Sequence, residues 1–420
     1  MMATLILAWK SLLNRRYTVG LTVLAIALAV ALLLGVERLR YEARSGFTAT
    51  ISGTDLIVGA RSSPVQLLLY SVFRMGEATN NISWRSYRQI ADHPRVQWTV
   101  PLSLGDSHRG YPVLATNQDY FKYYRYADAR PLELSQGEPF SGVFEAVLGN
   151  EVARELSYEL GREIVIAHGA DDVAFVRHDD MPFTVRGILA PTRTAVDRTI
   201  HISLEGFEAI HLGWQAGVPL PGRQVSPDEA RQRDLTPRQI TAFLVGLDSR
   251  AASFQLQRYV NDYPREALTA ILPGVALHQL WDLLGMAEQA LLLVSWFVVG
   301  VGLLGMLSAQ LSNLEARRRE MAILRAVGAG PRYILLLICG EALMLALLGA
   351  VLGTALLYAL LFFAGPLIEA RFGLFIGIGG LRPTELTYLG IVLLAGLFSG
   401  LVPAVRAYRQ AVVNGINMRL

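Results

Sequence analysis

Four long apolar runs divide the chain. They cover residues 17–36, about 290–311, 333–364 and 386–402. A helix rises about 1.5 Å per residue, so roughly 20 apolar residues cross the hydrocarbon core of a bilayer. The runs therefore predict four transmembrane α-helices. The third run is long enough that its helix must tilt, kink or protrude.

The stretch between the first and second runs has a different pattern. Residues 38–279 contain no run apolar enough to span a membrane. Strand-like pieces lie at 54–60, 98–104, 111–116, 145–150, 163–168, 181–190, 198–204 and 240–247, and helix-like pieces at 83–93, 151–160, 204–214 and 251–263. This mixture predicts a large α+β domain of two subdomains. The Pro- and Gly-rich loop at 217–239 is a boundary between them or a mobile flap.

Composition and charge place these elements in a membrane. Hydrophobic residues make up 52% of the chain and charged residues 17%, which is typical of an integral membrane protein with a polar part. Basic residues near the span ends set the orientation. They gather before the first run, between the second and third and after the fourth: Lys10, Arg15, Arg16, Arg317, Arg318, Arg319, Arg325, Arg332, Arg406, Arg409 and Arg419. Both termini are therefore expected in the cytoplasm and the large domain outside.

The segment between the second and third runs is more than a row of basic residues. Its charges come first, at Glu315, Arg317, Arg318, Arg319 and Glu320, and an apolar stripe follows at Met321, Ile323, Leu324 and Val327. Gly328, Gly330 and Pro331 then stop a helix. Anchoring by positive charge alone would need arginines but no apolar stripe. The ordered face favours an amphipathic helix that receives a partner protein.

The residues EARRREMAILRAVGAGPRYI at 315–334 resemble the cytoplasmic coupling segment of the ABC permeases grouped with MacB, LolC, LolE and FtsX. LAWKSLLNRR before the first span and PAVRAYRQ after the fourth are also similar to that family's termini. The layout of one span, a large periplasmic domain and three further spans extends the resemblance over almost the whole chain. The implied fold is a membrane protein of four transmembrane helices, with an α+β periplasmic domain inserted between helices 1 and 2.

The resemblance also implies a role and partners. The chain would be the permease subunit of a type VII ABC transporter in the bacterial inner membrane, passing motion to the periplasm to export or extract a lipoprotein, peptide or drug. A dimer of a separate ATPase subunit would dock on Glu315, Arg317, Arg318, Arg319, Glu320, Met321, Ile323, Leu324, Arg325 and Gly328. The other implied partners are a second permease copy or paralogue, membrane lipid, and a periplasmic adaptor or lipoprotein.

The predicted boundaries follow from these assignments. They are a cytoplasmic amphipathic helix (1–16), transmembrane helix 1 (17–37), the periplasmic domain with its stalk helices (38–279), the stalk and transmembrane helix 2 (280–311), the cytoplasmic coupling segment (312–332), transmembrane helix 3 (333–364), a periplasmic connection (365–384), transmembrane helix 4 (385–404) and a cytoplasmic tail (405–420).

The sequence gives little support for catalysis, nucleic acid binding or metal binding. No GxxxxGK[ST] phosphate loop occurs, so we expect no enzymatic activity and no cofactor in this chain, with ATP bound by the partner subunit. We also expect no nucleic acid partner. The histidines and aspartates at His168, Asp171, Asp172, His178, Asp179, Asp180, His201 and His211 lack a compact metal motif, so no metal site is assigned.

Two alternative functions are compatible with this sequence. A regulatory transducer like FtsX, which activates a periplasmic partner without moving cargo, has the same layout. A metal- or ligand-responsive membrane sensor would use the histidine-bearing domain.

Glu341 lies deep in the third run, where an unpaired charge is costly. We expect it to lie near the membrane boundary or to pair with a basic residue, rather than to form an ion site. The GxxxG spacings at Gly349/Gly353 and Gly396/Gly400 allow close helix approach.

Overall fold

The computed structural model describes two compact units. Its described residues are 16–127, 129–168, 180–212, 214–215, 218–219, 225–316, 323, 328–372, 377 and 379–416. The first unit contains residues 1–43 and 285–420, and the second contains residues 44–284. Each unit has its own hydrophobic core, so each is described by itself.

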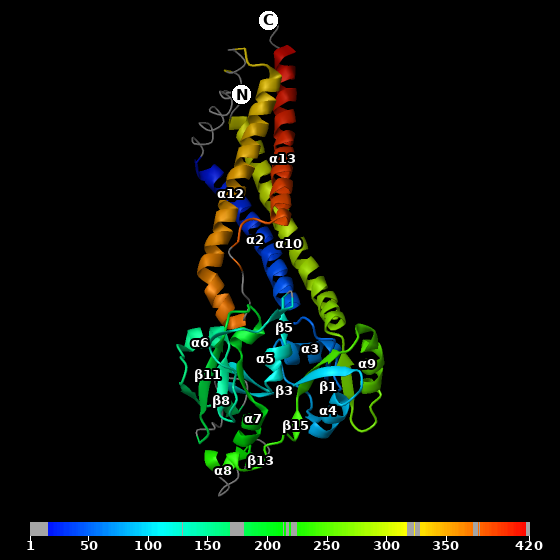
Figure 1. Ribbon diagram of the computed structural model, residues 1–420. Coiled ribbons are helices and arrows are strands. Elements are labelled where there is room, and N and C mark those ends of the chain that lie inside the picture. Colours follow the sequence, from blue (N-terminus) through cyan, green and yellow to red (C-terminus); the bar gives the residue numbers. More distant parts are fainter. Residues whose placement is uncertain are drawn as a thin grey trace. The chain divides into compact units, whose positions relative to one another are not determined.

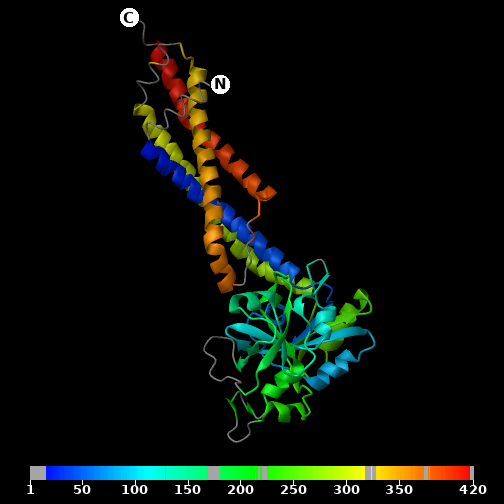
Figure 2. The ribbon, with the colours of Figure 1, turned by 60° about the vertical axis from the view of Figure 1, so that its left-hand side comes forward.

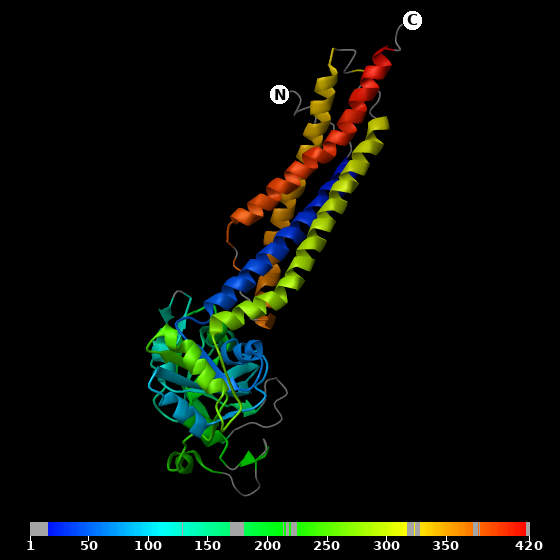
Figure 3. The same cartoon turned by 90° about the vertical axis from the view of Figure 1, so that its right-hand side faces the viewer.

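The first unit is a helical bundle. Its helices are α2 (Arg16–Ala49), α10 (Pro273–Ala316), α12 (Pro331–Phe372) and α13 (Pro383–Ile416). Among the described residues, four helices are long and apolar enough to cross a membrane, over Arg16–Glu42, Pro273–Ser312, Arg332–Gly365 and Pro383–Arg409. Helices α2 and α10 lie side by side (Figures 1 and 3). The prediction of four transmembrane helices, with an α+β domain inserted in the sequence between the first and the second, is confirmed.

All four helices extend beyond their apolar runs, and α2 continues to Ala49, past the predicted end of the first span at 37. Helix α12 continues through Gly365 to Phe372, into the predicted connection. Helix α13 passes Pro403 and ends at Ile416. A proline removes one backbone hydrogen bond, and a helix packed against neighbours tolerates that loss. Helix ends in this unit are therefore set by packing as well as by the apolar runs.

The second unit is built on one mixed sheet. Its main strands follow the order β17 (Leu268–Ile271), β1 (Leu56–Ala60), β16 (Ala242–Leu247), β3 (Val96–His108), β4 (Tyr111–Thr116), β12 (Ile200–Ser203), β8 (Glu145–Leu148), β11 (Phe183–Leu189) and β7 (Leu134–Gly137). Strand β10 (Ala167–His168) pairs with β3, and β9 (Glu163–Ile164) with β11. The long β3 joins the two halves of the sheet, because its first part pairs with β16 and its second part with β4.

Helices cover both faces of this sheet (Figures 1 and 2). Alternate residues of one strand point to opposite faces. Accordingly Leu56 and Val58 belong to one buried core and Ile57 to the other. The first core packs against α4 (Trp84–Ala91), α6 (Asn150–Leu156), α7 (Leu204–Ile210), α8 (Pro227–Arg231) and α9 (Ser253–Asn261), and the second against α3 (Pro64–Val72) and α5 (Asp119–Tyr123). Each of the eight strand-like pieces contains a strand and each of the four helix-like pieces contains a helix, but some predicted limits are wrong: α7 ends at Ile210, and Trp214 belongs to β13 (Trp214–Gln215).

Sequence patterns missed the short helices. Helix α8 lies inside the stretch expected as a loop, and a reciprocal capping box starts it: the Ser226 hydroxyl accepts from Glu229 N and the Glu229 carboxylate accepts from Ser226 N. Helix α3 begins similarly, with Ser63 Oγ accepting from Gln66 N. These caps satisfy backbone N–H groups that a short helix leaves without partners. They stabilise helices too short to show a periodic pattern.

Candidate functional sites

The predicted coupling segment connects α10 to α12. Helix α10 ends at Ala316, which places Glu315 in its last turn, and α12 begins at Pro331. Ile323, within the segment, is 58% exposed. Gly328 has φ +97°, a conformation that residues other than glycine rarely adopt, so it suits the end of a helix. The remaining predicted docking residues lie outside the described residues: Arg317, Arg318, Arg319, Glu320, Met321, Leu324 and Arg325.

Both ends of this segment enter one small apolar core, which we call the inner-end core. Its buried members are Leu314 of α10, Ile334, Ile338 and Cys339 of α12, and Ala404 and Ala407 of α13. Close-packed side chains do not deform continuously, so a displacement of one helix end is passed to its neighbours. The end of α10, the start of α12 and part of α13 are therefore packed against one another.

Both GxxxG spacings form close helix contacts. A Cβ atom added at Gly353 of α12 would lie 2.6 Å from the Ala27 carbonyl oxygen of α2. One added at Gly400 of α13 would lie 2.3 Å from Ala342 Cβ of α12. Missing side chains let the backbones approach closely enough for dispersion contacts that lipid cannot replace. Helix α12 is thus packed tightly against α2 on one face and against α13 on another.

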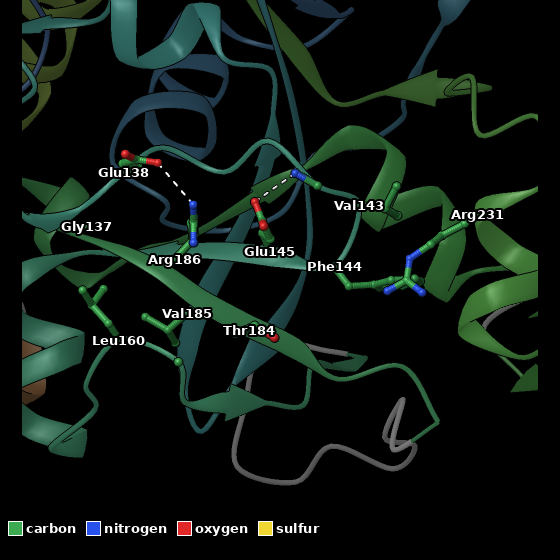
Figure 4. A pocket seen from close by; sticks show the side chains of 12 residues that line it. Gly137, Glu138, Val143, Phe144, Glu145, Leu160, Thr184, Val185, Arg186 and Arg231 are labelled. Atoms are coloured by element: carbon green, nitrogen blue, oxygen red, sulfur yellow. Dashed lines mark hydrogen bonds and ion pairs between the residues drawn. The ribbon is translucent and has the colours of Figure 1, made fainter.

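The second unit has a pocket of about 600 Å³ at the β7 side of its sheet, lined by residues of β7, β8, β11 and α8 (Figure 4). Glu145 accepts hydrogen bonds there from the backbone N–H groups of Ser141, at 2.7 Å, and Gly142, at 2.9 Å. The Ser141 bond is the main reason that the Glu145 pKa is lowered. Arg231 lies over the Phe144 ring, 5.1 Å from its centroid. The pocket therefore combines apolar and charged side chains.

The described histidines are engaged within the fold. His201 is fully buried beside Tyr120 and Phe121, and burial is the main cause that lowers its pKa from 6.5 to about 3. His108 contacts the Val165 carbonyl oxygen at 2.6 Å and the Tyr158 hydroxyl at 3.0 Å.

The structure describes some of the residues considered as metal ligands. His211 lies 3.6 Å from Asp106. The part of the chain that the structure describes holds no group of three or more potential metal ligands. Asp171, Asp172, His178 and Asp179 lie outside the described residues, and the side chain of His168 is not described.

Two solved structures similar to part of this chain are a periplasmic region and an extracellular domain. The periplasmic region of MacB from Actinobacillus actinomycetemcomitans shares 10% sequence identity, with 55% of this chain and 94% of that chain covered and a TM-score of 0.34. The extracellular domain of the noncanonic ABC-type transporter YknZ from Gram-positive bacteria shares 11%, with 52% and 99% covered and a TM-score of 0.31. No curated protein gives a significant match.

Two family models match successive parts of the chain. Residues 19–263 match the MacB-like periplasmic core domain, and residues 292–412 match the FtsX-like permease C-terminal region. The first match alone covers more than half of the 420 residues and includes the first span and most of the second unit. The second contains α12, most of α13 and the coupling segment. The chain is therefore a multi-pass membrane protein of the MacB/FtsX-type family of ABC transporter permeases.

Proposed function

We propose that the chain is the permease subunit that receives force from a separate ABC ATPase and passes it to a periplasmic domain. ATP-driven closure of the ATPase dimer would move residues 315–330, and the helices on either side would carry that motion across the inner membrane. The second unit, on the periplasmic side, would act on a hydrophobic or amphiphilic cargo such as a lipoprotein, peptide or drug. Both termini lie in the cytoplasm in this arrangement.

The inner-end core is the observation that carries this proposal. A segment that served only to anchor the chain by charge would need no packing between its two ends. Here Leu314, the last buried apolar residue before the segment, packs with Ile334 and Ile338, which follow it. Ala404 and Ala407 bring α13 into the same core. A partner that pushes on the segment therefore acts on three spans together.

The charge distribution supports the orientation. Arg317, Arg318 and Arg319 precede the apolar positions of the segment, and Arg406 and Arg409 belong to α13, whose residues Ala404 and Ala407 join the inner-end core. Basic residues at span ends mark the cytoplasmic side. The ATPase is cytoplasmic in ABC transporters of this family, so the segment and its partner would share one compartment.

Reversing the charge of the segment tests the docking. The full chain is co-expressed with each ABC ATPase chain of the same genome in turn, and the complex that assembles is reconstituted in lipid nanodiscs. The triple variant Arg317→Glu, Arg318→Glu, Arg319→Glu should keep the fold and membrane insertion but lose ATPase binding. As a matched control, Arg406→Glu with Arg409→Glu, at exposed positions of α13, should still bind. Undiminished binding and ATP hydrolysis by the triple variant would refute the docking site.

A further inference from the structure

Two charged residues are buried at the end of α2 that leads into the second unit. Glu37 is 3% exposed and Arg38 is 1% exposed, within the candidate span Arg16–Glu42. Charges inside a span are costly unless they are paired, and where they occur they commonly serve function. The next arginine of α2 differs: Arg40 is 30% exposed and pairs with Glu37 at 3.2 Å.

Arg38 joins α2 to the segment before α13. Its Nη2 donates to the carbonyl oxygens of Gly379, at 2.7 Å, and Gly380, at 3.3 Å. Its Nε lies 3.9 Å from Oε1 of Glu385, a carboxylate with no solvent exposure in the first turn of α13. In surroundings of low dielectric constant, this pair attracts far more strongly than an exposed pair would.

Helix α12 enters the same arrangement. The Tyr358 hydroxyl donates to the Gly379 carbonyl oxygen at 2.7 Å, and the Arg38 guanidinium lies 5.3 Å from the centre of the Tyr358 ring. One carbonyl oxygen therefore accepts from both α2 and α12. We call the set Arg38, Tyr358, Gly379, Gly380 and Glu385 the polar joint.

A second contact runs beside the joint. Arg382 pairs with Glu42 of α2, and its guanidinium lies 3.7 Å from the centre of the Tyr41 ring. The backbone N–H of Arg382 donates to Glu385 Oε2 at 2.9 Å. Glu385 thus caps the start of α13 and faces Arg38 at the same time. Both contacts connect α2 to α13 at the end opposite the inner-end core.

Simple anchoring does not explain Arg38. An arginine that only fixes the depth of a span extends its charged group to the interface and stays in contact with water. Arg40 fits that description, whereas Arg38 is directed into the bundle and held by three partners from other segments. A planar guanidinium can bind two carbonyl oxygens and a carboxylate at once, which an ammonium group cannot match.

We propose that Arg38 is a positioning residue. It links α2 to α12 near Tyr358 and to the start of α13 near Glu385, so that α2 moves when these two helices move. This inference rests on the proposed function and specifies its path. Force enters at the inner-end core and travels along α12 and α13, which are packed through Gly396 and Gly400. Helix α12 already contacts α2 through Gly353, and the polar joint adds the link to α2 that lies nearest the second unit. Residue 44, where the second unit begins, follows Arg38 by less than two helical turns.

The test uses the full-length chain with its ATPase in nanodiscs. A spin label at Gln255→Cys, an exposed position of α9, reports the distance between the two permease copies with ATP and with ADP. Arg38→Ala should assemble with the ATPase and hydrolyse ATP within about twofold of the unsubstituted complex, yet lose the ATP-dependent distance shift. Arg40→Ala is the matched control and should keep the full shift. Glu385→Gln retains shape and removes charge, so it should reduce the shift even if Arg38→Ala fails to fold.

The outcomes separate two failures. A full shift in a folded Arg38→Ala or Glu385→Gln complex would overturn the polar joint and leave the proposed function standing. Loss of ATP hydrolysis together with the shift would assign Arg38 to assembly and would also overturn the joint. An unsubstituted complex that binds and hydrolyses ATP without any shift would overturn both proposals.

Discussion

Acidification should destabilise the second unit through His201. The unfolded chain binds a proton at this imidazole below about pH 6.5, whereas the folded chain does so only near pH 3, because the ring is fully buried. The folded state therefore keeps its full stability above the unfolded pKa and loses it as the pH falls from 6.5 towards 3. Over the whole window the loss is about 5 kcal/mol, since each pKa unit is worth about 1.36 kcal/mol. At pH 5 about 2 kcal/mol of this has been lost.

The assay compares urea unfolding at pH 7.5 and pH 5.0, followed by tryptophan fluorescence of the full-length protein in detergent. Other titrating groups also contribute to the pH response, so the informative quantity is a difference between variants. In His201→Phe, which keeps a ring beside Tyr120 and Phe121, the stability lost between the two pH values should be smaller by about 2 kcal/mol. His278→Gln, at an exposed position of α10, should respond as the unsubstituted protein does. An equal pH response in His201→Phe would refute the reasoning.

Two further predictions concern packing and buried hydrogen bonds. Gly353→Leu should destabilise the bundle by about 1–3 kcal/mol, because its Cβ would overlap Ala27 O, while Gly305→Leu, with nothing within 4 Å, should be nearly neutral in the same thermal unfolding measurement in detergent. Equal midpoints for the two variants would contradict the close α2–α12 contact. Asp197→Ala should destabilise the second unit by about 1–3 kcal/mol, because the carboxylate accepts from the backbone N–H groups of Thr192 and Arg193. Urea unfolding measures this, and an unchanged midpoint would show that those groups find other partners.

Local patterns predicted most of the elements. The apolar runs predicted the four spans, and the alternation in pieces such as 111–116 predicted the strands. The order of the strands could not be predicted, because β1 pairs with β16 and β17, which are far away in the sequence: Leu56 pairs with Val245, and Ile57 with Ile271. Such pairings depend on the complete fold. The capping box of Ser226 and Glu229, with Pro227 at the start of the helix, was the local sign of α8 inside the Pro- and Gly-rich loop.

Some functional residues could be predicted from the sequence, and others could not. The charged start and apolar stripe of 315–330 predicted a docking helix, and most of that segment lies outside the described residues. Arg38 and Glu385 look from the sequence like ordinary charges that flank spans. Only the fold shows that they are buried and face each other across α2 and α13. The available signal was a pair of opposite charges at the ends of two apolar runs: Arg38 lies two residues after the first run, and Glu385 lies directly before the fourth.

The central claim is that force applied at residues 315–330 reaches the second unit. The most direct test measures the distance between Gln255 labels in the complex with its ATPase, with ATP and with ADP, for the unsubstituted chain and for Arg317→Glu, Arg318→Glu, Arg319→Glu. Cys339 is buried, and a chain without the Gln255 label controls for its reaction. We predict that ATP shifts the distance distribution in the unsubstituted complex and leaves it unchanged in the triple variant. Identical distributions with ATP and ADP in the unsubstituted complex, or the same shift in the triple variant, would contradict the account.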